Sequence, residues 1–489
     1  MRRPWFSLAA AVAALLALAA PTLACGGLIG PNGAVNLLRT TTFAGYHDGV
    51  EHYVTSFEFA GGGGAFGSIT PLPDIPTNVE RGGDWTLQRL ILETNPVRES
   101  AFFAADVAAG GHQREAEVLL ETTIDALDIT ILRGGGDEVG LWAKNHGFRL
   151  PPDAPQVLDF YADRSPIFMA AAFDADAAAE RGQAIGDGTP VHLTIPTDNP
   201  WVPLHILGLG KADAETVEAD VYLLTDQRPA LLPNAGGFAE SAGLILDHSA
   251  AATEALLADL RSDAGMGWVP KEAWLTKVVV DTSAGELTYD LAIDASGAGA
   301  PSRVDAGFAP FGPDPVPRAP VALYLLLAGV VVIGIPLLLV RTRGGVAGGT
   351  AARGGMTRRR IGPVAGALLL AVAAVAGCAP GPRTVTLTIH YSAFDLAELS
   401  VPRGVPVTFV FVNEDPIDHE WLIGDDAFHA AHRSGTHATH GDVPTEVTIP
   451  ALETVATTIT FDEPGRLAYI CHLPGHEAYG MVGVLTVEA

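Results

Sequence analysis

The chain has 489 residues, with 56 acidic side chains against 29 basic ones and a formal net charge of −27 when the histidines are neutral. This length allows about two to four domains, and the charge argues against a nucleic-acid partner, because nucleic-acid-binding surfaces are basic. The three cysteines are Cys25, Cys378 and Cys471. Since the first two each end an apolar segment, no structural disulfide is expected, and packed cores must stabilise the folded regions.

Residues 1–24 have the pattern of a secretory signal peptide, with Arg2 and Arg3 before an Ala/Leu run and small residues after it. Cys25 follows directly. The lipobox, the short motif that precedes a lipidated cysteine, would here be Thr22-Leu23-Ala24-Cys25, with Thr22 at the position where Leu is usual. Simple cleavage and lipidation of Cys25 are therefore both compatible with the sequence, and a permanent membrane span is the alternative. On the signal-peptide interpretation, the region that follows lies outside the cytoplasm.

Residues 25–302 are numerous enough for one large domain or two small ones. Apolar residues recur at helical spacing in residues 84–93, 115–127 and 250–261. The first of these patterns begins with Asp84 as a capping residue. Strand patterns bounded by Pro, Asp and Gly occupy residues 51–59, 68–72, 191–194, 221–224 and 277–293. The mixture predicts an α+β domain with a largely antiparallel sheet.

Few sequence motifs in this region indicate a catalytic or binding site. His47, Asp48 and His52 could form a metal cluster, but a surface loop is the interpretation favoured for them. Glycine runs at residues 61–64 and 134–136 lack the Lys-Ser/Thr of a phosphate-binding loop and are predicted to be turns. The opening Cys-Gly-Gly and the runs ITPLPDIP and VYLLTDQRP loosely resemble a family of secreted bacterial proteins of unknown function. This resemblance implies no catalytic or binding residue.

A stalk, an apolar segment and an arginine-rich segment come next. Residues 303–318 are rich in Pro, Gly and Ala, which is typical of an extended linker. Residues 319–340 carry no charge and are long enough to cross a bilayer as a transmembrane helix. Residues 341–360 contain arginines and no acidic residue, which predicts a cytoplasmic segment by the positive-inside rule.

Residues 361–378 form a second apolar segment, which ends in Val-Ala-Gly-Cys. We predict either a second transmembrane helix or a lipoprotein signal whose cleavage leaves a lipidated Cys378. Both outcomes place the C-terminal region on the same extracytoplasmic side of the cell membrane as the first region. Because the chain from Met356 onward is organised like a complete lipoprotein precursor, two neighbouring genes merged into one reading frame would explain this architecture.

The most informative stretch is residues 469–481, YICHLPGHEAYGM, a loop broken by proline and glycine. Cys471, His476 and Met481 stand in it with four residues between neighbours. A thiolate, an imidazole and a thioether are suited to copper, because soft sulfur favours Cu(I) and imidazole serves both oxidation states. His419, about fifty residues upstream, offers a second imidazole after a strand-like run. Zinc is the main alternative, although structural zinc sites usually contain several cysteines or paired histidines.

The order of these residues and the strand patterns of residues 384–489 resemble the cupredoxins, the plastocyanin-like blue copper proteins. HEWLIGD and CHLPGHEAYGMVG, with a His-bearing insertion between them, look most like periplasmic cupredoxins associated with copper tolerance. The resemblance implies an all-β Greek-key sandwich with a mononuclear type 1 copper site. Its equatorial ligands would be His419, Cys471 and His476, and its axial ligand Met481. Glu420 stands where many cupredoxins have Asn, a departure that bears on the hydrogen bonds around the thiolate.

The His-bearing insertion, residues 424–442, predicts a secondary metal site, because histidine-rich tracts are typical of metal binding. The candidate ligands are His429, His432, His437 and His440. A solvated loop with incidental histidines is the alternative. His472 is expected at the surface, since two adjacent residues rarely both bind one metal ion.

The leading interpretation is a membrane-anchored, extracytoplasmic copper protein that acts in copper handling, copper tolerance or one-electron transfer rather than in catalysis. From residue 384 onward, fifteen acidic side chains stand against three arginines. This charge suits copper capture, and equally docking to a basic redox partner or copper-trafficking protein. One alternative is a surface binding or scaffold protein fused to a cupredoxin. Another is a copper-dependent oxidoreductase, although only one Cys-His-Met loop occurs.

Overall fold

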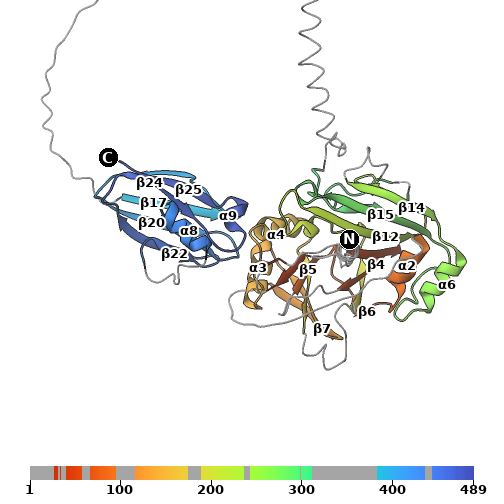
Figure 1. The fold of residues 1–489 in the computed structure, drawn as a ribbon. Coiled ribbons are helices and arrows are strands. Elements are labelled where there is room, and N and C mark those ends of the chain that lie inside the picture. The colour runs from red at the N-terminus through yellow and green to blue at the C-terminus, as the bar shows by residue number, and fades with distance from the viewer. Residues whose placement is uncertain are drawn as a thin grey trace, which may run out of the picture. The chain divides into compact units, whose positions relative to one another are not determined.

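A computed structural model of the chain describes residues 27–30, 33–34, 40–57, 67–94, 116–174, 189–235, 243–297, 299–310, 383–434 and 443–489 (Figure 1). Outside these residues lie the expected signal peptide, residues 311–318 of the expected stalk, both apolar segments and Cys378. Residues 303–310 of the expected stalk are described, and Ala306 among them is fully buried in the N-terminal core. His437 and His440 also lie outside them. The described residues build five sheets, three in the N-terminal region and two in the C-terminal region.

A seven-stranded sheet and a six-stranded sheet dominate the N-terminal region. In spatial order, the seven strands are β14 (Leu244–Ala251), β15 (Trp274–Ser283), β12 (Thr216–Thr225), β3 (Thr40–His47), β4 (Val50–Phe57), β10 (Thr189–Pro196) and β6 (Asn78–Arg81). The six strands are β2 (Gly33–Ala34), β1 (Gly27–Gly30), β5 (Gly67–Pro71), β9 (Ile167–Phe173), β8 (Leu127–Arg133) and β7 (Glu117–Ile124). Pairing is antiparallel except between β3 and β12 in the larger sheet.

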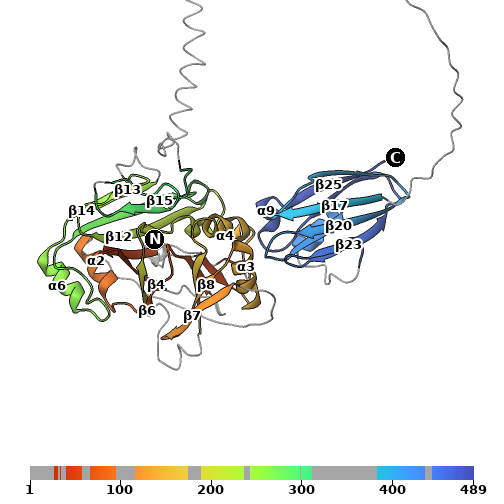
Figure 2. The same ribbon diagram turned by 180° about the vertical axis from the view of Figure 1, so that it is seen from behind.

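A short third sheet, four α-helices and two 3-10 turns complete the described part of this region. The sheet contains β11 (Trp201–Val202), β16 (Leu291–Asp294) and β13 (Ala230–Leu232). The helices are α2 (Thr86–Thr94), α3 (Gly136–Asn145), α4 (Ala154–Ala162) and α6 (Glu254–Ser262), with the 3-10 turns η1 (His205–Gly208) and η2 (Ala284–Glu286). Both views show α2 and α6 side by side near the larger sheet (Figures 1 and 2). Leu90 and Leu260 of these helices share a buried cluster with Phe43 and Val54 of the sheet.

The expectation of an α+β domain overstated the helices, because most of the regular secondary structure among the described N-terminal residues consists of strands. The helix predicted for residues 115–127 is the clearest error. Its β-branched residues form β7, which turns at Asp125 (φ 56°) into β8. The helix predicted for residues 84–93 is present as α2. The carboxylate of Asp263 lies at its start, where it accepts from the amides of Asp84 and Trp85, just before the helix, and from the hydroxyl of Thr86.

The transmembrane expectation is corrected as well. Among the described residues, no helix is both long and apolar enough to cross a membrane. Residues 319–340 and 361–378, on which that expectation rested, lie outside the described part of the chain.

The C-terminal region consists of two sheets packed face to face, as the strand patterns predict. One sheet contains β18 (Ala393–Phe394), β17 (Arg383–His390), β20 (Pro406–Asn413) and β23 (Thr454–Thr460), and the last three lie side by side in Figure 2. The other contains β19 (Glu398–Val401), β25 (Val482–Val487), β24 (Gly465–Ile470), β21 (His419–Gly424) and β22 (Glu446–Ile449). The helices α8 (Asp426–Arg433) and α9 (His476–Tyr479) lie in its connections.

Alternation of side chains along these strands explains the packing. On β20 every second residue is buried, because successive side chains point to opposite faces of a strand. Phe409 and Phe411 thereby reach the core, where their rings lie 5.0 Å from that of Trp421 on the opposite sheet. This aromatic layer forms a rigid frame under the loop that contains Cys471, which belongs to the same core cluster.

Candidate metal centre

The four residues predicted as copper ligands lie at the ends of strands in the C-terminal region. His419 begins β21, Cys471 follows β24, His476 begins α9, and Met481 precedes β25. Because β21 pairs with β24, the ends of these two strands bring His419 near a cysteine 52 positions away in the sequence. The fold therefore gathers residues from two separate segments.

Backbone hydrogen bonds close the loop of residues 471–481 on itself. The amide of Cys471 donates to the carbonyl of Met481 at 3.2 Å, and the amide of Met481 donates to that of His476 at 3.0 Å. Gly475 (φ 86°) and Gly480 (φ 112°) flank α9 in the left-handed region, which favours glycine. The two glycines thus allow the sharp turns that present His476 and Met481 on one side of the loop.

Three of the four side chains meet in a buried cluster. Ligand atoms of His419, Cys471 and His476 all lie within 4.8 Å of one another. Nδ1 of His419 is 3.2 Å from Nδ1 of His476. His419 and Cys471 are fully buried, and His476 is only 4% exposed. Met481 is also fully buried and packs in the same core cluster as Cys471.

Asp415 orients His419 from outside the cluster. Its Oδ2 lies 2.8 Å from Nε2 of His419, which must donate because a carboxylate only accepts. The Nδ1 lone pair of a neutral His419 then faces the cluster. Burial raises the pKa of Asp415, but hydrogen bonds from His419 and from the amide of Ser392 outweigh it, so the pKa lies below its usual value.

The thiol of Cys471 has a backbone donor. The amide of Glu420 donates to Sγ at 3.3 Å, a contact that does not depend on the side chain at that position. Replacement of Asn by Glu420 therefore leaves this hydrogen bond in place. Burial raises the pKa of Cys471 to about 12 and, together with the nearby His419, lowers that of His476 to about 3. At neutral pH the imidazole of His476 is thus unprotonated and able to bind a metal ion.

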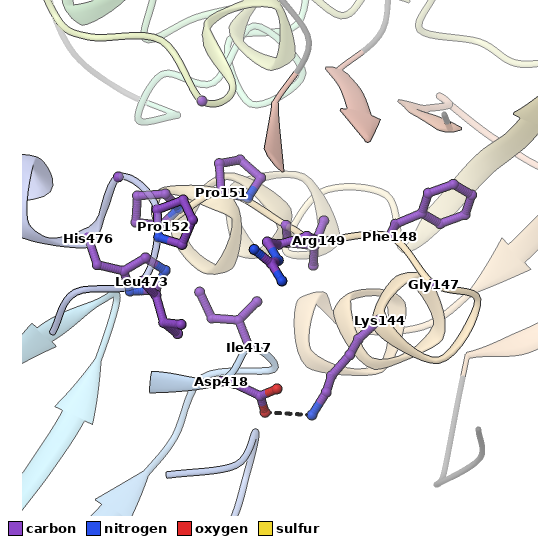
Figure 3. Close-up of a pocket in the computed structure, with 14 residues that line it drawn as sticks. Lys144, Gly147, Phe148, Arg149, Pro151, Pro152, Ile417, Asp418, Leu473 and His476 are labelled. Atoms are coloured by element: carbon purple, nitrogen blue, oxygen red, sulfur yellow. Dashed lines mark hydrogen bonds and ion pairs between the residues drawn. The ribbon is translucent and has the colours of Figure 1, made fainter. Parts of the chain in front are cut away.

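The cluster approaches solvent at His476. This residue, Ile417, Asp418 and Leu473 are among those that line a pocket (Figure 3). The other two members of the cluster have no exposed surface.

The His-bearing insertion is only partly described. His429 and His432 lie on α8, whose first turn is capped by the carboxylate of Asp425. His429 is 1% exposed, and its Nδ1 lies 2.9 Å from Nε2 of His472. His472, expected at the surface, has a side chain that is only 9% exposed. The contact between His429 and His472 was not predicted from the sequence. Alternation of side chains could have indicated it, because His472 follows Cys471 and must point to the opposite side.

The three N-terminal residues considered as a possible metal cluster, His47, Asp48 and His52, do not meet at one point. His47 contacts Asp226 at 2.6 Å and Asp48 at 3.4 Å. His52 turns instead to His192 of β10, with Nδ1 2.9 Å from Nε2. Among the residues searched, which are the described ones, the only cluster of three close metal-ligand side chains is that of His419, Cys471 and His476.

Two protein families match this chain. Residues 19–294 match a family described as uncharacterized proteins conserved in bacteria, DUF2330. Residues 384–488 match the copper binding proteins of the plastocyanin/azurin family. The first match covers more than half of the chain, and the second includes all four residues predicted as copper ligands.

Individual relatives are copper proteins. The copper-resistant cuproprotein CopI of Pseudomonas aeruginosa is 28% identical over 145 residues, which cover 23% of this chain and 80% of the relative. CopI of Rubrivivax gelatinosus is 33% identical over 115 residues, which cover 22% of this chain and 69% of the relative. Among solved structures, auracyanin A, a "blue" copper protein from Chloroflexus aurantiacus, is 30% identical with a TM-score of 0.19. That match covers 22% of this chain and 100% of auracyanin A.

Proposed function

Because this chain belongs to the bacterial DUF2330 family and its C-terminal region is a copper-binding cupredoxin, we propose that it is an extracytoplasmic copper-handling protein. In this proposal one type 1 copper ion is held by His419, Cys471 and His476, with Met481 as axial ligand. The observation that carries it is the buried cluster of one sulfur and two imidazole donors within 4.8 Å.

The donor set fits copper better than the common alternatives. Calcium and magnesium prefer oxygen ligands, and the cluster has none. Structural zinc sites are usually completed by several cysteines or paired histidines, whereas here the fourth candidate is a buried thioether. Two imidazoles, one thiolate and a distant Met are the arrangement of blue-copper sites. A bound copper ion would supply one-electron redox chemistry.

The protein's own contribution would be to hold these ligands still. Asp415 orients His419, the amide of Glu420 contacts the Cys471 sulfur, and the loop hydrogen bonds connect Met481 to the same frame. Second-shell contacts of this kind orient ligands and tune a metal site. A preformed, buried site suits both tight copper capture and electron transfer with little rearrangement.

Copper handling is favoured over electron transfer by the relatives, which are named as copper-resistant cuproproteins. One-electron transfer is the second candidate, and it is favoured by His476, which is 4% exposed in a cluster whose other two members are fully buried. A basic redox partner or a copper-trafficking protein would be attracted by the acidic C-terminal region. We propose no catalytic reaction for the centre.

The extracytoplasmic location is supported by the signal-like pattern of residues 1–24. Lipidation of Cys378 after cleavage would attach the cupredoxin to a membrane as a separate product. Immunoblotting with antibodies to each region tests this. Two shorter bands would support cleavage, whereas one band near full length would support a single two-region protein. Cys378→Ser should abolish cleavage-dependent lipid labelling of the C-terminal product.

A copper titration of the purified full-length protein tests the centre itself. Binding of Cu(II) to the thiolate should give an intense absorption band at roughly 600 nm. Cys471→Ser should remove the band, while Cys378→Ser, which removes a thiol outside the cluster, should leave it unchanged. Absence of the band in the wild-type protein, or its persistence in Cys471→Ser, would overturn the proposed type 1 site.

A further inference from the structure

Asn413 ends β20 and stands six positions before His419. It is the only asparagine from residue 384 onward, and it is 3% exposed. A buried side-chain amide is costly unless its donor and acceptor groups are hydrogen-bonded. The partners of Asn413 therefore indicate what its side chain does in the fold.

Both polar atoms of this side chain have backbone partners. Oδ1 accepts from the amide of Asp415 at 2.9 Å. Nδ2 donates to the carbonyl oxygen of Ile417 at 2.8 Å and to that of Pro450 at 2.9 Å. The orientation of the side-chain amide follows from these partners, because a backbone N–H only donates and a carbonyl oxygen only accepts. One side chain thus connects three backbone positions.

The first contact fixes Asp415, whose carboxylate accepts from His419. The amide of Asp415 donates to Asn413, and its carbonyl oxygen accepts from the amide of Leu452 at 3.0 Å. Because the backbone of Asp415 is held on both sides, its carboxylate has little freedom to move away from Nε2 of His419, which lies 2.8 Å from Oδ2. Asn413 therefore acts on His419 through Asp415.

The other two contacts fix the backbone around His419. Ile417 stands two positions before His419 in the chain. Pro450 follows Ile449, which is the partner of His419 in the pairing of β21 with β22. Asn413 thereby joins the turn that leads into His419 to the strand beside it. All the groups that it joins belong to the protein, so these contacts can form before a metal ion binds.

The position of Asp415 matters for the chemistry of the centre. A carboxylate that accepts from the outer nitrogen of a metal-binding imidazole orients the ring and raises the basicity of its other nitrogen. A more basic donor stabilises Cu(II) more than Cu(I), because the ion of higher charge gains more from donated electron density. The reduction potential of a bound copper ion is therefore expected to depend on how firmly Asp415 is held.

We propose that Asn413 is a positioning residue of the copper centre. Its side-chain amide fixes the turn of residues 413–418 and holds Asp415 against His419 before copper binds. It thereby lowers the reduction potential relative to a site without this support. This inference rests on the proposed type 1 site, and it assigns to Asn413 no contact with the copper ion.

Asn413→Ala tests this role in the purified full-length protein. The variant removes the acceptor of the Asp415 amide and the donor to Ile417 and Pro450, and it changes no charge. We expect its affinity for Cu(II), measured by competition with a chelator, to fall about 10–100-fold, as loss of a supporting contact does at other metal sites. Its affinity for Cu(I) should fall about tenfold less. That difference raises the reduction potential by about 59 mV for a one-electron couple.

A second substitution separates positioning through Asp415 from a general loss of stability. In Asp415→Ala the carboxylate is absent, so Asn413→Ala should raise the reduction potential no further in that background. Shifts in potential that simply add would overturn the proposal. Thr408→Val is the matched control, because it removes a hydrogen bond with Thr458 from the same strand, and it should leave the potential unchanged.

The absorption band near roughly 600 nm distinguishes failure of this inference from failure of the proposed function. Wild-type protein without the band would overturn the type 1 site, and the role of Asn413 with it. A wild-type band together with an equal potential in Asn413→Ala would overturn only the role of Asn413. Where chemical denaturation shows that Asn413→Ala does not fold, Asn413→Ser removes the same amide with a smaller loss of volume, and its potential is measured in the same way.

Discussion

Asp415 accepts a hydrogen bond from His419 at 2.8 Å, and this contact directs Nδ1 of His419 toward His476. The same carboxylate accepts from the amides of Tyr391 at 2.7 Å and Ser392 at 2.8 Å. Both of these residues have φ near +50°, a conformation that non-glycine residues rarely adopt. Asp415 thus couples a strained turn to the orientation of a candidate copper ligand.

Asp415→Asn tests this coupling. His419 and the amide of Ser392 share Oδ2 of Asp415, and the amide of Tyr391 uses Oδ1. Because an Asn side chain has one accepting oxygen and one NH2 group, either the first two donors or Tyr391 must lose the acceptor. We expect copper affinity to fall about 10–100-fold, measured by competition with a chelator of known affinity. Glu414→Gln changes the neighbouring, half-exposed carboxylate and should leave affinity unchanged. Equal affinity of Asp415→Asn and wild type would contradict an orienting role.

Met481→Leu tests the axial position. Leucine fills a similar volume, so this buried exchange should cost less than about 1.5 kcal/mol of folding stability. Copper should still bind through the three remaining ligands, and the band near roughly 600 nm should persist. Because loss of a ligand favours Cu(I), which tolerates lower coordination, the reduction potential should rise. Potentiometric titration of both proteins measures this, and an unchanged potential would argue that Met481 does not contact the copper.

The candidate copper-binding loop could be recognised in the sequence because its determinants are local. Cys471, His476 and Met481 lie in eleven consecutive residues, and their side-chain chemistry is visible without a fold. The strands of the C-terminal region could be predicted for a similar reason, since period-two alternation marks each one. His419 could be placed in the site only because its strand end and the loop follow the order found in cupredoxins.

The supporting contacts could not be predicted, because they join segments that only the fold brings together. Asp415 depends on a turn at Tyr391 and Ser392 with positive φ, and that turn contains no glycine to mark it. His472 depends on the placement of α8 across β24. In the N-terminal region, the apolar residues of residues 115–127 matched a helical period by chance. Most of this segment forms a strand instead, because its β-branched side chains favour strands.

We expect the folding stability of the N-terminal region to depend on the buried carboxylate of Asp290. It is fully buried, lies 2.6 Å from Arg164, and accepts hydrogen bonds from the Tyr161 hydroxyl and the Leu204 amide. Asp290→Asn keeps the volume but leaves the buried guanidinium without its counter-ion. We expect a loss of about 3–5 kcal/mol in the free energy of unfolding, because removing one partner of a buried pair leaves an uncompensated charge.

Chemical denaturation of the full-length protein, followed through its N-terminal transition, measures this loss. Glu117→Gln is the matched control, because Glu117 pairs with Arg133 at an exposed position and should contribute about 1 kcal/mol or less. Similar losses for the two variants would show that the Asp290 pair is no more important than a surface ion pair.

Glu51 should make the N-terminal region less stable as the pH rises. Its carboxyl on β4 is fully buried, and burial raises its pKa from 4.5 to about 8, although the backbone of Trp201 acts in the opposite direction. Between these values the folded state keeps a proton that the unfolded state has lost. Folding is therefore most favoured below pH 4.5, and the contribution of Glu51 declines as the pH rises to about 8.

The total change corresponds to roughly 4–5 kcal/mol, because each unit of pKa difference is worth about 1.4 kcal/mol. Glu51→Gln keeps the shape of a neutral carboxyl and cannot ionise, so the variant should unfold with a weaker pH dependence and be more stable than wild type at pH 8. Denaturation curves at several pH values between 5 and 8 measure the slope for both proteins. Parallel slopes would mean that Glu51 titrates alike in the folded and unfolded states, and that its buried carboxyl is ionised at neutral pH.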